Sequence, residues 1–148
     1  MIFSSEMMRL VLTAREKIDA PKKSRKRILV VDDEPDIVFT LKNVLESISF
    51  EVVTSTDVDF ALKKFKAGYF DLTILDIKMP KMNGFELYVK LKAIDEEMKA
   101  IFLSALSDLQ NYSVLKDDVY PKWGERHFVK KPIENNELIE EVDLVLSL

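Results

Sequence analysis

The chain has 148 residues, of which 47% are hydrophobic and 32% charged, and this length suits one domain with a sizeable core. It has no cysteine and one histidine, His127, so the sequence excludes a disulfide framework, zinc sites built from thiolates or histidine clusters, and a cysteine nucleophile. Any bound metal must therefore be held by oxygen, which favours Mg2+, Mn2+ or Ca2+.

The net charge of -4 conceals two regions of opposite sign. Residues 1–27 hold eight basic and three acidic residues, whereas residues 28–148 hold 14 basic and 23 acidic ones. We therefore place an N-terminal extension at residues 1–24 and a domain at residues 25–148. The extension is compatible with an amphipathic helix over residues 5–19, with disorder, or with a start at Met7 or Met8. The basic run over residues 22–27 is compatible with a solvated linker, or with contact to nucleic acid, an anionic membrane or an acidic partner.

The sequence predicts neither export nor a membrane span. Arg9 interrupts the apolar run at Met7–Leu12, and no segment approaches the ~18 apolar residues that a spanning helix needs. Together with the absence of cysteine, this leads us to expect a cytoplasmic protein.

From Ile28 onward, short apolar runs alternate with segments of helical period. Strands are expected at residues 28–31, 52–53, 72–75, 100–103 and 128–129, and helices at 35–48, 58–65, 85–94, 109–119 and 138–146. A carboxylate of Asp32-Asp33-Glu34 is suited to cap the first helix. We expect Gly68 to end the second helix and Ile94 to belong to the buried stripe of the third. Asp117-Asp118, Pro121 and Gly124 disrupt the fourth. Five βα units in a row predict an α/β domain whose parallel sheet is covered on both faces.

The residues at the carboxyl ends of these strands suggest chemistry. Asp76 ends the third strand just before a Pro and Gly turn, in the position where open α/β sheets bind ligands. Asp32 and Asp33 follow the first strand, Ser104 the fourth, and Lys130-Lys131-Pro132 the fifth. Three carboxylates that meet at one edge repel one another unless a hard cation lies among them, which argues for an oxygen-ligated divalent ion. A lysine and a hydroxyl beside that ion would suit a phosphoryl group.

With these residues in place, the chain resembles a response regulator receiver domain of two-component phosphorelay signalling. The resemblance covers residues 26 to about 148, and it rests on Asp32-Asp33, Asp76 with Met79-Pro80 and Gly84, Ser104-Ala105, and Lys131-Pro132 in the family's order and approximate spacing. It implies a flavodoxin-like, doubly wound (βα)5 fold like that of CheY, with strand order 2-1-3-4-5.

The resemblance also implies a role for each site residue. Asp76 would be the phosphoacceptor that attacks the phosphohistidine of a sensor histidine kinase or a histidine phosphotransfer protein. Asp33 would bind Mg2+ directly and Asp32 largely through water, with Asp76 and the backbone carbonyl of Lys78 completing the protein's ligands. Lys131 would pair with the phosphoryl oxygens, since in the family this lysine directly precedes the proline. Ser104 would move toward the phosphoryl group and Phe128 would be the aromatic switch.

Each residue also has a purely structural interpretation. Asp32 and Asp33 would then cap a helix, and Asp76 would cap a turn or start a helix. Ser104 would be a turn residue, Lys131 a solvated lysine and Phe128 part of the core.

The segment between Ser104 and Lys131 is longer than in typical receivers, and the excess lies in Asp117 to Arg126, with Trp123 packed over the loop or exposed for a partner.

Lys78, two residues after Asp76, flanks the phosphoryl site, and we hypothesise that it alters access of the hydrolytic water.

Three classes of function follow. The first is a stand-alone receiver that signals through the face built by strands 4 and 5 and their helices, without a DNA-binding output domain, because the last helix runs to Leu148. The second is a receiver-like scaffold or dimerisation module, with the N-terminal extension as one route to its contacts. The third is a metal-dependent phosphatase with an aspartyl-phosphate intermediate, which is disfavoured because Lys78 stands where that class carries a second aspartate. We expect a protein that is no enzyme beyond catalysing its own phosphorylation and dephosphorylation.

Overall fold

The computed structural model describes Ser5, residues 25–105 and residues 127–148. The N-terminal extension, the helix expected at 109–119 and Trp123 lie outside the described residues. The elements in chain order are β1 (Arg27–Val31), α2 (Pro35–Ser47), β2 (Glu51–Ser55), α3 (Val58–Lys64), β3 (Leu72–Asp76), α4 (Gly84–Ile94), β4 (Ala100–Ser104), β5 (Phe128–Lys130) and α7 (Asn135–Leu146).

The five strands form one parallel sheet in the order β2-β1-β3-β4-β5, which confirms the expected α/β architecture and strand order. The register pairs Asp76 of β3 with Leu103 of β4, and Ser104 of β4 with Lys130 of β5. Parallel strands end on one side of the sheet, so this register brings the polar residues that follow them to a shared edge.

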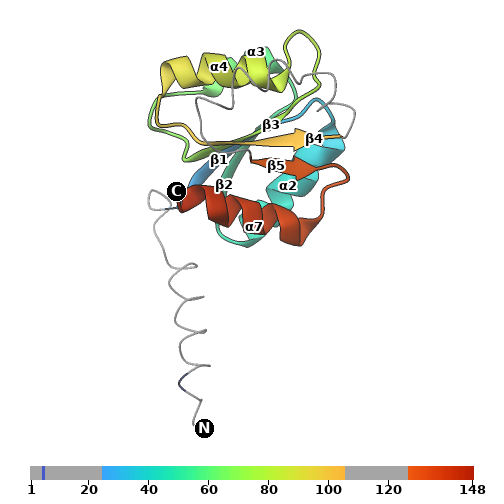
Figure 1. The fold of residues 1–148 in the computed structure, drawn as a ribbon, viewed down its shortest axis with the longest axis vertical. Helices are drawn as coiled ribbons and strands as arrows, with labels where there is room; N and C mark the ends of the chain where they lie inside the picture. The colour runs from blue at the N-terminus through green and yellow to red at the C-terminus, as the bar shows by residue number, and fades with distance from the viewer. Residues whose placement is uncertain (1–4, 6–24, 106–126) are drawn as a thin grey trace.

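The sheet separates two hydrophobic cores, because alternate residues of each strand face opposite sides. Leu29 and Val31 face the core that includes residues of α3 and α4, whereas Ile28 and Val30 face the core that includes residues of α2 and α7. Figure 1 shows the same layering, with α3 and α4 on one side of the sheet and α2 and α7 on the other. All five residues of β3 and of β4 are buried, as expected for central strands of a doubly covered sheet.

Two local expectations are wrong. The second helix, α3, ends at Lys64 and not at Gly68, because Phe65 already has an extended backbone and packs into the core. Gly68 lies four residues later in the connection to β3, where its φ of +75° suits glycine. Ile94 does not join the buried stripe of α4, since it is the last residue of that helix and remains 46% exposed.

The end of the basic run belongs to the folded domain. Arg27 is the first residue of β1, and its Nε atom lies 3.2 Å from Glu51 Oε2 on β2. Lys26 Nζ lies 3.9 Å from Asp71 Oδ1, and the backbone N–H of Arg27 donates to Asp71 Oδ2 at 2.8 Å. The described part of this run therefore stabilises the start of the sheet and is not only a solvated linker.

Candidate phosphoryl and metal site

Three carboxylates meet at the carboxyl edge of the sheet. Asp32 and Asp33 follow β1 and Asp76 ends β3, and the three offer oxygen atoms that all lie within 4.8 Å of one another. Asp32 is completely buried and Asp76 is 2% exposed, whereas Asp33 is half-buried. Strands that neighbour each other in the sheet thus place three acids, two of them desolvated, around one point, as the sequence predicted.

The ammonium group of Lys131 lies beside this cluster. Its Nζ atom is 3.0 Å from Asp32 Oδ2 and 3.2 Å from Asp76 Oδ1. Lys131 also contacts a carboxylate outside the cluster, since Glu34 Oε1 lies 3.3 Å from the same Nζ atom. The sequence analysis missed this contact because it considered Glu34 only as a helix cap. The run Asp32-Asp33-Glu34 was the available signal, since all three acids follow one strand.

These contacts shift the pKa values of the partners. Burial, and then the neighbouring charge of Asp32, raise the pKa of Asp76 to about 7, although Lys131 partly opposes this rise. Burial also raises the pKa of Asp32, against the hydrogen bond from the Glu34 backbone and the charge of Lys131. For Lys131, burial lowers the pKa, but the two buried aspartates more than offset it, so the net direction is upward and the lysine stays charged.

The cluster fits a hard divalent cation. Its donors are all carboxylate oxygens, and Asp32 Oδ2 is buried without a hydrogen bond of good geometry, although the Lys131 ammonium lies 3.0 Å away. A hollow of about 530 Å³ lies over the cluster. Its lining residues are Asp33, Glu34, Asp76, Lys78, Met79, Pro80, Ala105 and Lys131.

The helix after β1 begins differently from the expectation. Glu34 is the N-cap of α2 but its side chain makes no capping hydrogen bond, and Pro35 occupies the first turn. The carboxylate of Asp32 instead accepts the backbone N–H of Glu34 at 2.9 Å, in a local turn that holds Asp32 in the cluster. Glu34 therefore does not cap the helix through its side chain, and its carboxylate contacts Lys131 instead, as does that of Asp32.

The loop after Asp76 is anchored to the start of α4. Asn83 caps the helix by accepting the N–H of Glu86 at 2.9 Å. The backbone N–H of Gly84 donates to the carbonyl of Ile77 at 2.8 Å. A β-carbon on residue 84 would collide with the carbonyl oxygen of Asp76, so glycine is required here for close approach. The sequence analysis identified this glycine only as part of a turn and as one of the residues that carry the family resemblance.

Ser104 and Phe128 belong to β4 and β5, and neither lines the hollow over Asp76. Ser104 ends β4 and is 2% exposed, and its carbonyl accepts the N–H of Lys131 at 2.9 Å. Within the described residues, the hollow is lined by Ala105 and not by Ser104. Phe128 begins β5 and is half-buried, with ring centroids 5.9 Å from Phe102 and 6.5 Å from Phe85. The peptide bond between Lys131 and Pro132 is cis.

Comparisons with known proteins assign the chain to a family. The sequence profile of the response regulator receiver domain matches residues 28–143. The chemotaxis protein CheY of Bacillus subtilis is 30% identical over 122 residues, which cover 82% of this chain and 98% of CheY. The alkaline phosphatase synthesis transcriptional regulatory protein PhoP of the same species is 33% identical over 121 residues, covering 82% of this chain and 48% of PhoP. The chain likewise spans only 36% and 48% of two probable transcriptional regulators, from Cyanophora paradoxa and Guillardia theta.

The solved structures agree. The response regulator TrrA of Thermotoga maritima, determined in complex with Mg2+ and BeF, superposes with a TM-score of 0.68 at 37% identity and covers 81% of this chain and 98% of its own. Among the described residues, no helix has the length and apolar character needed to cross a membrane. The profile match over most of the chain, the near-complete overlap with CheY and the shared sheet order place this protein in the response regulator receiver domain family, whose members are signalling modules of two-component systems.

Proposed function

We propose that the protein receives a phosphoryl group on Asp76 from a sensor histidine kinase or a histidine phosphotransfer protein. The observation that carries this proposal is the position of the Asp76 carboxylate, which is buried between the Lys131 ammonium at 3.2 Å and the carboxylates of Asp32 and Asp33. Phosphoryl transfer requires little of the protein beyond positioning and charge neutralisation, and these groups supply both.

In the proposed reaction, a carboxylate oxygen of Asp76 attacks the phosphorus atom of a phosphohistidine. A phosphorus–oxygen bond forms to give an acyl phosphate, the phosphorus–nitrogen bond breaks, and its electron pair stays on the departing imidazole. Lys131 would shift from Asp76 to the phosphoryl oxygens. Its ammonium group would move only a short distance, because it also contacts the carboxylates of Asp32 and Glu34. Mg2+, bound by Asp32, Asp33, Asp76 and the backbone carbonyl of Lys78, would neutralise negative charge on the transferred group.

The proposed output is a repacking around β4 and β5. If the phosphoryl oxygens draw the Ser104 hydroxyl toward Asp76, the space vacated allows Phe128 to move inward from its half-buried position. Such a change shifts a population between two packings and alters the surface that a downstream protein, or a second copy of this chain, contacts.

The first test is the intact mass of the protein after incubation with acetyl phosphate and Mg2+. We expect an adduct of one phosphoryl group that is absent in Asp76→Asn and in the presence of EDTA. A folded wild-type protein that binds Mg2+ but gains no mass would contradict the proposal and favour a receiver-like scaffold that signals without phosphorylation. Phosphorylation of Asp76→Asn to the same extent would place the acceptor elsewhere.

Output through this domain alone stays a prediction. The chain aligns with nearly all of CheY, which favours a receiver that acts by direct protein contacts, but it also aligns with about half of PhoP. The phosphatase alternative stays disfavoured because Lys78 stands two residues after the proposed nucleophile.

A further inference from the structure

A second hollow, of about 590 Å³, lies beside the short helix α3 and the edge strand β2. Its lining residues are Val53, Phe60, Lys63, Lys64, Lys66, Tyr69 and Phe70. We call it the lysine–aromatic pocket. None of these residues lines the hollow over Asp76, so this pocket is a separate site.

The pocket exists because α3 is short. This helix has seven residues and ends at Lys64, whereas α2 has 13 and α7 has 12. Beyond Lys64 the chain leaves the helix and returns to the sheet through residues 65–71, so the outer part of β2 lacks a full helical cover. Val53, whose side chain faces α3, is consequently only half-buried and contributes to the lining.

The pocket is positively charged within an acidic domain. Residues 60–70 contain three lysines and no acid. Among the described residues, no carboxylate forms an ion pair with Lys63, Lys64 or Lys66, whereas nearby Lys81 pairs with Asp57 at 3.3 Å and with Asp59 at 2.8 Å. Three ammonium groups without carboxylate partners in this part of the structure favour an anionic ligand.

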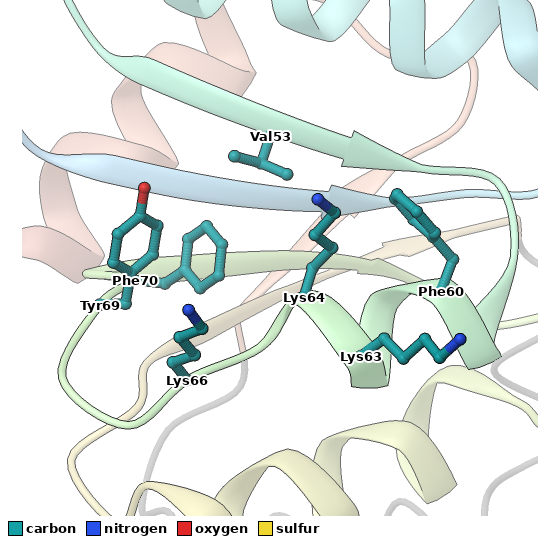
Figure 2. A pocket seen from close by; sticks show the side chains of 7 residues that line it. All are labelled: Val53, Phe60, Lys63, Lys64, Lys66, Tyr69 and Phe70. Carbon is teal, nitrogen blue, oxygen red and sulfur yellow. The ribbon is translucent and has the colours of Figure 1, made fainter.

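The pocket also presents aromatic rings that are held in place. Tyr69 is 38% exposed, its ring meets Phe70 edge-on at 4.9 Å, and the Arg27 guanidinium lies 4.3 Å from its centroid. Arg27 is itself held by Glu51. Phe60 is 44% exposed and has Lys64 Nζ 5.3 Å from its centroid. Figure 2 shows Tyr69 and Phe70 at one end of the pocket and Phe60 at the other, with Lys64 between them.

We propose that the lysine–aromatic pocket binds a nucleoside phosphate. A planar base would stack on the exposed ring of Phe60, and the phosphate would contact Lys64 and Lys66. The volume lies within the range of small-molecule sites. A small ligand is favoured over a peptide because the lining comes from one β2 residue, one short helix and the loop after it, and so forms a local hollow and not a long groove.

The test is a titration of the uniformly 15N-labelled full chain with ADP, followed by NMR, with EDTA present so that the acidic cluster holds no metal–nucleotide complex. We expect shifts of the backbone amides over residues 60–70, with a dissociation constant on the order of 1 mM or lower. The double variant Lys64→Gln/Lys66→Gln should weaken binding about tenfold or more, and Phe60→Leu several-fold. The matched controls are Lys90→Gln and Phe39→Leu, which change an exposed lysine and an exposed phenylalanine elsewhere and should leave the affinity unchanged.

Adenosine tests the stacking of the base alone, and inorganic phosphate tests the contact with the lysines alone. Each should bind more weakly than ADP, which makes both interactions. Equal binding of phosphate and ADP would overturn it in favour of a simple anion site. Shifts confined to the residues around Asp76, or no shift at saturating ADP, would also overturn it. Binding of an acidic peptide in place of ADP would make the pocket a protein-docking surface instead.

Discussion

Gly84 lies so close to Asp76 that no other residue fits at position 84 without moving the backbone of the proposed phosphoacceptor. A β-carbon there would collide with the carbonyl oxygen of Asp76 and lie 3.1 Å from the Cα atom of Ile77. The first turn of α4 therefore packs directly against the end of β3, which carries the Asp76 carboxylate.

Gly84→Ala should consequently destabilise the protein by about 2–3 kcal/mol, as overpacking of a buried site does. Urea unfolding monitored by circular dichroism measures this loss. Gly68→Asn is the matched control, because Gly68 has a φ of +75° that asparagine tolerates, and a β-carbon at this position would meet no atom within 4 Å. This control should cost less than about 1 kcal/mol, and equal losses for the two variants would contradict the role given to Gly84.

Asp76→Asn should stabilise the metal-free protein in a pH-dependent manner. Burial and Asp32 raise the pKa of Asp76 from 3.8 to about 7 in the folded state, so ionising Asp76 costs folding free energy. Well below pH 3.8 the aspartate is protonated in both the folded and the unfolded state, and the cost vanishes; the cost grows as the pH rises from 3.8 to about 7 and is constant above that. We expect a gain of about 1–2 kcal/mol at pH 8, after allowing for solvent screening, that disappears toward pH 4.

Unfolding in EDTA at several pH values measures this dependence. Glu140→Gln, which changes an exposed acid of α7, is the control and should show no such trend. A gain that is independent of pH would mean that Asp76 is not destabilised by its charge.

Lys131→Met should destabilise the protein and abolish phosphorylation. Lys131 is the cation within 3.2 Å of the two buried aspartates, and its removal leaves their charges uncompensated. We expect a loss of about 3–5 kcal/mol in metal-free protein at pH 8, with partial recovery at lower pH as the aspartates become protonated. Lys130→Met, at the exposed neighbouring position, should leave both stability and phosphorylation close to wild type. An unchanged stability of Lys131→Met would argue against a net role for the ion pairs.

Asp33→Asn should weaken Mg2+ binding about tenfold or more while leaving the contacts of Lys131 with Asp32 and Asp76 intact. A ligand at ten times its dissociation constant stabilises the folded state by about 1.4 kcal/mol, so thermal unfolding at increasing Mg2+ concentration reports the affinity. Asp36→Asn, an exposed acid in the first turn of α2, is the control. If both variants respond to Mg2+ like the wild type, the metal is held elsewhere.

Lys78→Ala should change the rate at which the acyl phosphate hydrolyses. Lys78 is exposed and lines the hollow over Asp76, which an attacking water would have to enter. We expect a change of about threefold or more in the decay of the phosphorylated protein, measured by intact mass after the phosphodonor is removed. Lys90→Ala should decay like the wild type, and identical rates for all three proteins would refute the hypothesis.

The sequence by itself determined the layered α/β fold and most of the site residues. Apolar runs at Ile28–Val31, Leu72–Leu75 and Ala100–Leu103 indicate strands buried on both faces, and strands joined by helices must lie parallel. Parallel strands end at one edge, and this geometric rule was enough to predict that Asp32, Asp33, Asp76 and a lysine of the fifth strand's end come together. The resemblance to receiver domains then singled out Lys131, because it directly precedes Pro132.

Only the tertiary structure decided the contacts that depend on distances between elements. The pairing of Lys131 with Glu34, the collision that requires Gly84 and the half-buried position of Phe128 depend on how α2, α4 and β5 pack, which local patterns do not encode. The end of α3 at Lys64 likewise reflects the burial of Phe65, a tertiary contact that overrides the stop signal at Gly68. The lysine–aromatic pocket lies beside that early end, and three of its lining residues, Lys66, Tyr69 and Phe70, come from the loop that follows the helix.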